Sequence, residues 1–333
     1  MPSQSTGAPA RQATAARYSA LRPAGLCQAF DPLGSKGGPF AERDHATLSS
    51  ASHESAGWTS YLKAGGRTEA VDPEAFREYA RHDDYPRASA YDAVWAHLNH
   101  MGPNVLWLTE ALTQVMAFEP GMRVLDLGCG AAISSIFLAR EFGVQVWAAD
   151  LWIDPSTNRP RIVEADVADR VFPISAEAHT LPFAHDFFDA LVSIDSYHYY
   201  GTDMRYLTYV AQFVRPGGAF GIVVPANAVD PDDLPAELIA TAPLGADYFT
   251  FRSAEWWRRH WSRTSGIRVT HADMIADGWD LWHRHAQANE AWDGIPLAET
   301  GDGPLLLSEH GKHLGFARVT ATRRSGSSND SDG

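Results

Sequence analysis

Cysteine, positive charge and long hydrophobic runs are scarce in this sequence, and each shortage excludes a class of protein. The two cysteines, Cys27 and Cys129, cannot build a framework of disulfides, so we expect the reducing cytoplasm as the compartment. Lys and Arg number 27 against 41 Asp and Glu, which gives a net charge of −14 and argues against a nucleic-acid partner. No apolar run is long enough to span a membrane, and the N-terminus shows no apolar segment of a secretory signal. The composition therefore favours a small molecule as the partner.

The length of 333 residues allows one large domain with additions or two domains. Residues 1–55 are rich in Ala, Ser, Gly and Pro, and we expect a largely disordered or loosely packed arm there. The Ser- and Asp-rich residues 324–333 are predicted to form a disordered tail. We therefore expect one folded domain between these two segments.

The most informative stretch is residues 123–139, RVLDLGCGAAISSIFLA. Its first residues form a short apolar run, which indicates a buried strand of a parallel sheet. Asp126, Gly128, Cys129 and Gly130 then predict a tight turn, and apolar residues at helical spacing predict a helix that ends near Gly143. A strand, a glycine turn and a helix in this order form the first unit of a nucleotide-binding α/β domain.

The turn departs from the fingerprint of dinucleotide-binding proteins. G-x-G-x-x-G would require glycine at the position of Ile133. Asp126 would also repel a pyrophosphate, whereas it suits a cationic ligand. An NAD-dependent oxidoreductase is therefore the less favoured alternative.

Further strands are predicted at 144–149, 171–175, 188–193, 220–224, 267–270 and 314–321, with the last one antiparallel. Helices are predicted at 72–84, 91–100, 104–118, 206–214, 253–263 and 277–289. Asp150 ends the second strand, and an acidic residue at this distance from the glycine turn can accept hydrogen bonds from both ribose hydroxyls. The alternative is that Asp150 caps the following helix.

The chain resembles the class I S-adenosylmethionine-dependent methyltransferases, in particular the small-molecule, type 11-like members. The resemblance covers residues 105–225 and rests on three motifs: Asp126-Leu127-Gly128-Cys129-Gly130-Ala131-Ala132, Leu181-Pro182-Phe183 and Phe188-Asp189-Ala190-Leu191-Val192-Ser193. Ala132 replaces the third glycine of the family's first motif. The implied fold is α/β, a Rossmann-like, seven-stranded, mostly parallel sheet with helices on both faces, an antiparallel last strand and a helical N-terminal cap.

The resemblance also implies a division of the chain. Residues 72–118 would form the helical cap, and residues 119–323 the S-adenosylmethionine-binding domain. Residues 226–265 would be an insertion on the substrate side.

S-adenosyl-L-methionine is the implied cofactor. Leu151 and Trp152 would pack on the adenine, Glu177 would accept its amino group and the Ala178 N–H would reach the ring; Trp152 as core packing is the alternative. The expected cofactor-binding residues are Asp126, Gly128, Cys129, Gly130, Asp150, Leu151, Trp152, Glu177, Ala178, Ser193, His100 and Asn104. For His100 and Asn104, placed by the resemblance near the methionine end, ordinary capping and packing are the alternatives.

The predicted catalytic residues follow the fourth strand, where acceptor and cofactor meet in an open α/β sheet. His198 is the first candidate for a general base, with Asp195 and Tyr197 beside it. A hydrogen-bonded wall residue is the alternative for His198. The residues expected to contact substrate are Tyr91, Tyr199, Tyr200, Trp256 and Trp257. We expect no metal, because the His pairs at 97/100 and 310/313 lack cysteine partners and an H-E-x-x-H motif.

The sequence therefore predicts an enzyme that moves a methyl group to O, N or C of a small aromatic or otherwise apolar metabolite. A second hypothesis, from another class, is a non-catalytic subunit that binds the cofactor and regulates a partner. The sequence leaves a homodimer open.

Overall fold

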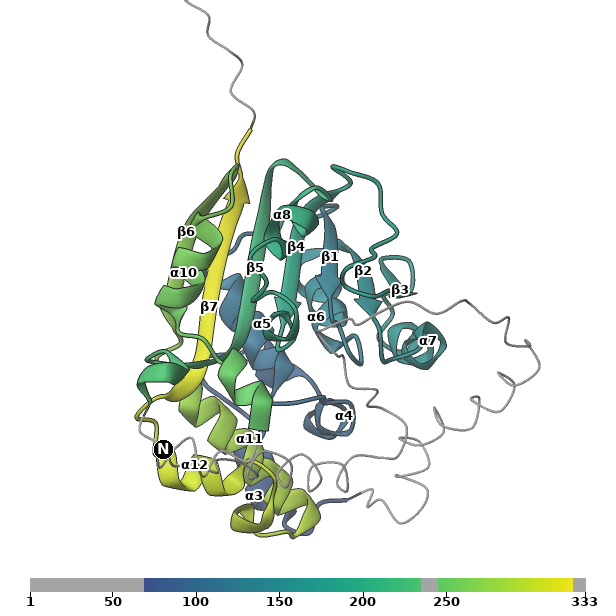
Figure 1. Ribbon diagram of the computed structural model, residues 1–333. Coiled ribbons are helices and arrows are strands. Elements are labelled where there is room, and N and C mark those ends of the chain that lie inside the picture. Colours follow the sequence, from purple (N-terminus) through teal and green to yellow (C-terminus); the bar gives the residue numbers. More distant parts are fainter. Residues whose placement is uncertain (1–68, 235–244, 326–333) are drawn as a thin grey trace, which may run out of the picture. The chain divides into compact units, whose positions relative to one another are not determined.

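The computed structural model describes residues 69–234 and 245–325 (Figure 1). The predictions for residues 1–55, for most of the tail, and for part of the 226–265 insertion fall outside the described residues.

One seven-stranded sheet forms the centre of the described chain (Figure 1). Its strand order is β3-β2-β1-β4-β5-β7-β6. Strands β1 to β5 run parallel, and β7 lies antiparallel between β5 and β6. The strands are β1 Arg123–Leu127, β2 Gln145–Asp150, β3 Val171–Ser175, β4 Phe188–Ile194, β5 Val214–Asn227, β6 Ile267–Met274 and β7 Leu314–Arg323. The predicted Rossmann-like fold with an antiparallel last strand is confirmed.

Helices cover both faces of the sheet because adjacent strand residues point to opposite sides. Val124 packs with α5, α6 and α11 on one face, whereas Leu125 packs with α8 and α10 on the other. The helices are α3 Pro73–Tyr79, α4 Ala93–Leu98, α5 Val105–Thr113, α6 Ile133–Phe142, α7 Pro155–Glu164, α8 Tyr206–Ala211, α10 Ala254–Ser262, α11 Gly278–Asp293 and α12 Gly303–Glu309. Single turns of 3-10 helix lie at Ala88–Ala90, Tyr197–Tyr199, Pro231–Asp233 and Leu297–Glu299, and a longer one at Gly245–Thr250.

The segment 72–118 divides between two environments. α5 packs on the sheet against β4, β5 and α6, so it belongs to the main core. α3 packs on α11 through a small separate cluster that contains Phe76, Ala288 and Trp292. The role of the whole segment as a cap stays a prediction.

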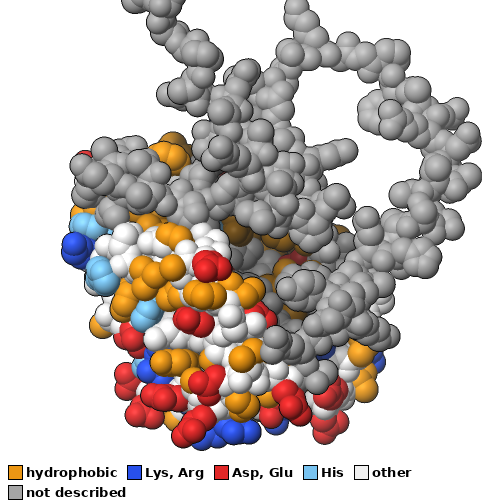
Figure 2. Space-filling view, turned by 90° about the horizontal axis from the view of Figure 1, so that it is seen from below, with side chains coloured by type: hydrophobic (Ala, Val, Ile, Leu, Met, Phe, Trp, Pro, Cys, Tyr) orange, Lys and Arg blue, Asp and Glu red, His pale blue; other side chains and the backbone are white. Residues whose placement is uncertain are grey.

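Acidic side chains are prominent on the surface, as the net charge of −14 requires. Figure 2 shows the face that lies at the bottom of Figure 1, where acidic groups outnumber basic ones and hydrophobic groups are scattered between them. Within the described residues, no helix has the length and apolarity needed to cross a membrane.

Candidate functional site

The glycine turn between β1 and α6 is held against the end of β2. The N–H groups of Gly128 and Cys129 donate to the Ala149 carbonyl at 2.8 and 3.1 Å. Gly128 (φ 73°) and Gly130 (φ 53°) adopt left-handed conformations, which glycine tolerates best. A Cβ on Gly128 would lie 1.9 Å from the Ser196 hydroxyl oxygen, so this position also has no room for a side chain.

The Asp150 carboxylate joins this turn to the chain after β2. Its Oδ2 accepts the Gly130 N–H at 2.8 Å, and its Oδ1 accepts the N–H groups of Trp152 and Ile153 at 2.7 and 2.9 Å. Asp154, not Asp150, caps α7, by accepting the Ser156 N–H. Oδ1 already accepts two N–H groups, whereas Oδ2 accepts one and has a second lone pair, so Asp150 retains the capacity to accept one further proton, such as that of a ribose hydroxyl.

Asp126 lies beneath the N-terminus of α6 and is fully buried. Its Oδ2 accepts the hydroxyls of Ser134 and Ser135, each at 2.6 Å, while its buried Oδ1 has no hydrogen-bond partner. Burial raises the pKa of this carboxyl to about 6. An unpaired buried oxygen below a bare glycine turn fits a site that gains a donor when a cationic cofactor is bound.

Two residues of α7 that the sequence analysis missed support the same turn. Asn158 donates its amide to the Gly130 carbonyl at 2.9 Å. Arg161 donates to the Ala131 carbonyl at 2.9 Å and to Asn99 Oδ1 at 2.7 Å, so it also joins the segment after α4. The i, i+3 spacing of Asn158 and Arg161 was the signal available, because it places both on one face of a helix.

Hydroxyl groups gather where β1 and β4 end. Ser193 donates to the Leu127 carbonyl at 2.7 Å, and the Tyr200 hydroxyl donates to the same carbonyl at 3.1 Å. The Tyr200 hydroxyl also lies 3.1 Å from Ser193 Oγ and 3.2 Å from Ser196 Oγ. Ser193 and Tyr200 are thus brought to the glycine turn, as expected of a cofactor residue and a substrate residue.

The three predicted catalytic residues lie in different surroundings. Asp195 (φ 54°) comes close to Gly102, where a Cβ would lie 2.2 Å from Asp195 Oδ2, and burial raises the pKa of Asp195 to about 8. His198 is 1% exposed, and burial lowers its pKa to about 3, so its ring is neutral. Tyr197 packs in the core against Trp257 and Trp261. The structure does not gather the three side chains into one constellation.

The remaining predicted residues are distributed around the sheet. The side chains of Leu151 and Trp152 are more than half exposed, so both could pack against a bound ligand. The rings of Trp152 and Tyr199 lie 6.1 Å apart between centroids. Glu177 bonds the ring and the N–H of His179 at 2.7 and 2.9 Å. The Ala178 carbonyl accepts a hydrogen bond from the Tyr206 hydroxyl. The side chains of Cys129 and Trp257 are buried, and the Trp256 ring stacks on His260.

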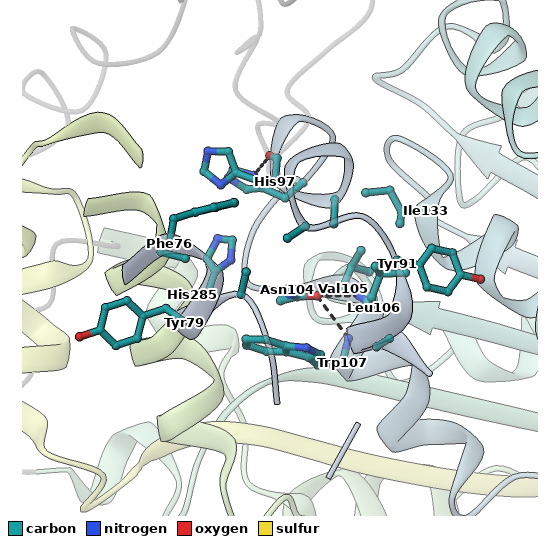
Figure 3. A pocket seen from close by; sticks show the side chains of 16 residues that line it. Phe76, Tyr79, Tyr91, His97, Asn104, Val105, Leu106, Trp107, Ile133 and His285 are labelled. Atoms are coloured by element: carbon teal, nitrogen blue, oxygen red, sulfur yellow. Dashed lines mark hydrogen bonds between the residues drawn. The ribbon is translucent and has the colours of Figure 1, made fainter. Parts of the chain in front are cut away.

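A cavity lies between α3, α4, α11 and the first turns of α5 and α6 (Figure 3). Its volume is about 30 Å³, enough for one or two waters. Asn104 lines it and caps α5 by accepting the N–H groups of Leu106 and Trp107. Its lining also includes Tyr91, His97, His100, Ile133 and His285.

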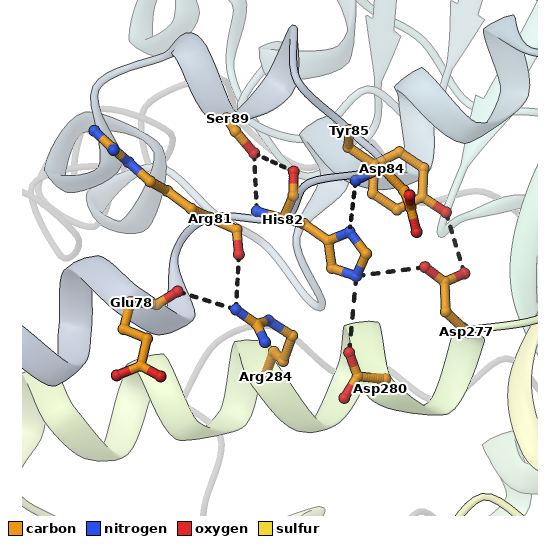
Figure 4. Close-up of polar contacts among 9 residues, drawn as sticks. All are labelled: Glu78, Arg81, His82, Asp84, Tyr85, Ser89, Asp277, Asp280 and Arg284. Carbon is orange, nitrogen blue, oxygen red and sulfur yellow. Dashed lines mark hydrogen bonds and ion pairs between the residues drawn. The ribbon is translucent and has the colours of Figure 1, made fainter.

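A polar cluster around His82 holds the segment after α3 on α11 (Figure 4). His82 Nε2 lies 3.4 Å from Asp277 Oδ2 and 3.7 Å from Asp280 Oδ2, and its Nδ1 accepts the Asp84 N–H. His82, Asp84 and Asp277 place three ligand-type atoms within 4.8 Å of one another. Because Nδ1 accepts the Asp84 N–H, the ring proton sits on Nε2 and faces the two carboxylates, and the Tyr85 hydroxyl donates to Asp277 Oδ1 at 3.2 Å, so contacts within the protein account for the cluster.

The comparison with protein families agrees with this geometry. Residues 124–218, which run from β1 into the start of β5, match the family model described as a methyltransferase domain. Residues 124–218 therefore resemble a methyltransferase domain, which agrees with the predicted family, the class I S-adenosylmethionine-dependent methyltransferases.

Two curated relatives are similar to this chain. Methyltransferase GfsG of Streptomyces halstedii is 32% identical over 116 residues, which cover 34% of this chain and 42% of GfsG. The 27-O-demethylrifamycin SV methyltransferase of Amycolatopsis mediterranei (strain S699) is 26% identical over 171 residues, which cover 51% of this chain and 62% of that protein. The chain thus spans less than two thirds of the length of either relative.

Among solved structures, a putative sarcosine dimethylglycine methyltransferase from Galdieria sulphuraria is similar in fold. It aligns with a TM-score of 0.57 and 16% identity, over 80% of this chain and 98% of that one. This likeness supports the fold.

Proposed function

We propose that this protein transfers the methyl group of S-adenosylmethionine to a small, aromatic or otherwise apolar molecule. The observation that carries the proposal is the glycine turn, whose bare backbone is fixed by Asp150 on one side and whose buried Asp126 retains an unpaired oxygen. The methyltransferase-domain match over residues 124–218 supports the same ligand.

Each part of the site has a task in holding the cofactor. Asp150 accepts a ribose hydroxyl through the remaining lone pair of Oδ2, and the exposed Leu151 and Trp152 cover the adenine. Asn158 and Arg161 keep the turn in place through the carbonyls of Gly130 and Ala131. When bound, the cofactor supplies an electrophilic methyl group with a neutral thioether as leaving group, so the protein needs mainly to align the acceptor.

Entry of the cofactor requires a local rearrangement. The Tyr200 hydroxyl and Ser196 stand over Gly128, and the Met101 sulfur lies 3.0 Å from the place of a Cβ on Gly130. These side chains cover the backbone that a cofactor would approach. We infer that they move aside on binding, which the flexible thioether of Met101 permits.

The setting of the reaction completes the proposal. We infer a cytoplasmic protein without a nucleic-acid partner, since the chain is acidic and has two cysteines. A homodimer stays an open prediction.

The test is transfer of label from methyl-labelled S-adenosylmethionine to a metabolite extract by the full chain. We expect labelled small molecules with the wild type and a strong loss with Asp150→Ala. Binding of cofactor without any transfer would instead support a non-catalytic, regulatory subunit. NAD-dependent redox activity together with no binding of S-adenosylmethionine would support the oxidoreductase.

A further inference from the structure

Asp195 carries a carboxyl group for which the fold provides no partner. Within the described part of the chain, its side chain makes no hydrogen bond and no ion pair, and burial alone raises its pKa to about 8. A carboxylate that is withdrawn from water without a donor or a cation beside it costs stability. A group of this kind is a candidate for contact with a ligand that supplies the missing partner.

The backbone around Asp195 holds this carboxyl in its place. The Asp195 N–H donates to the Val223 carbonyl at 2.8 Å, which keeps the residue paired with β5 directly after the end of β4. Its φ of 54° lies in the left-handed region, which a residue with a Cβ adopts at a cost. Gly102 leaves room for the carboxyl, because a Cβ there would lie 2.2 Å from Asp195 Oδ2. A strained backbone and a bare glycine thus both serve to place one unpaired side chain.

The two segments that meet at Asp195 also touch the glycine turn. Ser196 follows Asp195, and its hydroxyl oxygen lies 1.9 Å from the place of a Cβ on Gly128. Met101 precedes the glycine that faces Asp195, and its sulfur lies 3.0 Å from the place of a Cβ on Gly130. The carboxyl is therefore adjacent to the backbone on which the cofactor is proposed to lie.

The order of the strands indicates which end of the cofactor reaches Asp195. Strands β2, β1 and β4 are neighbours in this order, so the glycine turn after β1 lies in the middle. Asp150, the proposed ribose ligand, ends β2, and Asp195 follows β4 on the other side. These two strands are two strand spacings apart, which is about 10 Å. A cofactor that has its ribose at β2 and crosses the turn directs its methionine part towards β4.

The methionine part carries the group that an unpaired carboxylate lacks. Its α-ammonium has a positive charge and three N–H donors, whereas its own carboxylate would be repelled by Asp195. Asp126 is the other carboxylate near the turn with an unpaired oxygen. It lies within β1 and already accepts the hydroxyls of Ser134 and Ser135, so Asp195 has the greater need of a donor.

We propose that Asp195 is the counter-ion of the α-ammonium group of S-adenosylmethionine and of S-adenosylhomocysteine. The proposal rests on the proposed function and gives Asp195 a task in holding the cofactor. This task replaces the part in proton transfer that the sequence suggested for it. The site would then distinguish the complete cofactor from analogues that lack the amino group.

Titration calorimetry of the full chain with two matched ligands tests the proposal at pH 7.5. The ligands are S-adenosylhomocysteine and its desamino analogue, in which hydrogen replaces the α-amino group and the rest of the molecule is unchanged. We expect the wild type to bind S-adenosylhomocysteine about 10- to 100-fold more tightly than the analogue, because the analogue lacks the charged donor. The readout is an affinity and requires no methyl acceptor.

Variants assign this preference to Asp195. Asp195→Asn keeps the shape of the side chain and removes its charge, so it should lower the affinity for S-adenosylhomocysteine about 10- to 100-fold. It should change the affinity for the analogue by less than about threefold. Asp203→Asn, at an exposed aspartate after the same strand, is the matched control and should leave both affinities unchanged. If thermal unfolding shows that Asp195→Asn does not fold, Asp195→Gly, which suits a φ of 54°, takes its place with the same expected pattern.

Equal affinity of the wild type for the two ligands would overturn the proposal, as would a loss in Asp195→Asn that is the same for both. A preference for the amino group that survives in Asp195→Asn and disappears in Asp126→Asn would assign the ammonium to Asp126 and overturn it too. In all these outcomes S-adenosylhomocysteine still binds the wild type, so the proposed function stands. Binding of neither ligand would refute the proposed function and the role of Asp195 together.

Discussion

Asp150 is the side chain on which the proposed cofactor binding would depend most directly, since it holds Gly130, Trp152 and Ile153 at once. We expect Asp150→Asn to lower the affinity for S-adenosylhomocysteine about 10- to 100-fold, because hydrogen bonds to a charged acceptor are lost. Calorimetry measures the change. Asp154→Asn is the matched control: it sits at the exposed N-cap of α7 and should leave affinity unchanged. An unchanged affinity in Asp150→Asn would contradict the role of this carboxylate.

Asp126 gives a prediction about pH. Its pKa rises on folding from the ordinary value of 3.8 to about 6, so the folded state holds the proton more tightly. Ionisation of this buried carboxyl therefore costs stability as pH rises from 4 to 6, and above pH 6 the full cost remains. Asp126→Asn should be stabilised relative to the wild type by up to about 3 kcal/mol at pH 7 and hardly at all at pH 4.

Denaturant unfolding of both proteins at pH 4, 5, 6 and 7 checks this dependence. The stability difference between variant and wild type should grow with pH. A difference that is constant across the range would mean that Asp126 keeps an ordinary pKa in the folded protein.

The sequence predicted those site residues that belong to a local motif. Gly128 and Gly130 lie in the turn that the strand–turn–helix pattern predicts, and Asp150 and Ser193 lie near it because β2 and β4 both pair with β1; their role in cofactor binding stays a prediction. Asn158 and Arg161 were missed because their contacts with the turn come from a separate polar helix. The burial of His198 beside Phe251 was equally hidden, since it depends on a segment that folds over it from beyond β5.

At the scale of elements, His82 contributes to the attachment of the segment after α3 to α11. This side chain is 12% exposed and faces both Asp277 and Asp280. We expect His82→Ala to destabilise the protein by about 1–3 kcal/mol, because the half-buried Asp277 loses the imidazole beside its Oδ2 and keeps only the Tyr85 hydroxyl on Oδ1. Hydrogen exchange should show faster exchange in α3 than in β1 or β4. His283→Ala, on the same side of the domain but stacked on Trp279, should leave α3 protected.

The turn between β1 and α6 gives a second prediction at this scale. Gly128→Ala should weaken cofactor binding and destabilise the fold by about 1–3 kcal/mol, since φ is +73° and the new Cβ meets Ser196. The double variant Gly128→Ala/Ser196→Gly removes the clash but not the backbone strain, so unfolding experiments should show partial recovery. Full recovery would mean that the left-handed backbone costs nothing, and no recovery that the clash is unimportant.

The strands were predicted better than the helix ends. Strands of a buried sheet are recognisable as apolar runs, which is why the predicted segments overlap all seven strands. The helix predicted at 104–118 ends at Thr113 in the structure. The prediction was too long because Val115 and Met116 continue the apolar pattern, although they pack on the core from a turn after the helix. Periodicity alone does not distinguish these two cases.

At the scale of the whole molecule, the sheet order brings the ends of β1, β2 and β4 to one edge. Residues far apart in the sequence, from Gly128 to Asp150 and Tyr200, meet there as a consequence. The sequence predicted this architecture through the order of its motifs. The cavity between α3, α4 and α11 could not be predicted, because it depends on how a helix near the C-terminal end packs on the segment ahead of β1.

The central claim is that the glycine turn binds a sulfonium nucleoside and not a dinucleotide. Titration calorimetry of the full chain with S-adenosylmethionine and with NAD tests it most directly. The account predicts saturable binding of S-adenosylmethionine with one site per chain and no heat of binding for NAD. Binding of NAD, or no binding of S-adenosylmethionine by the folded protein, would contradict it.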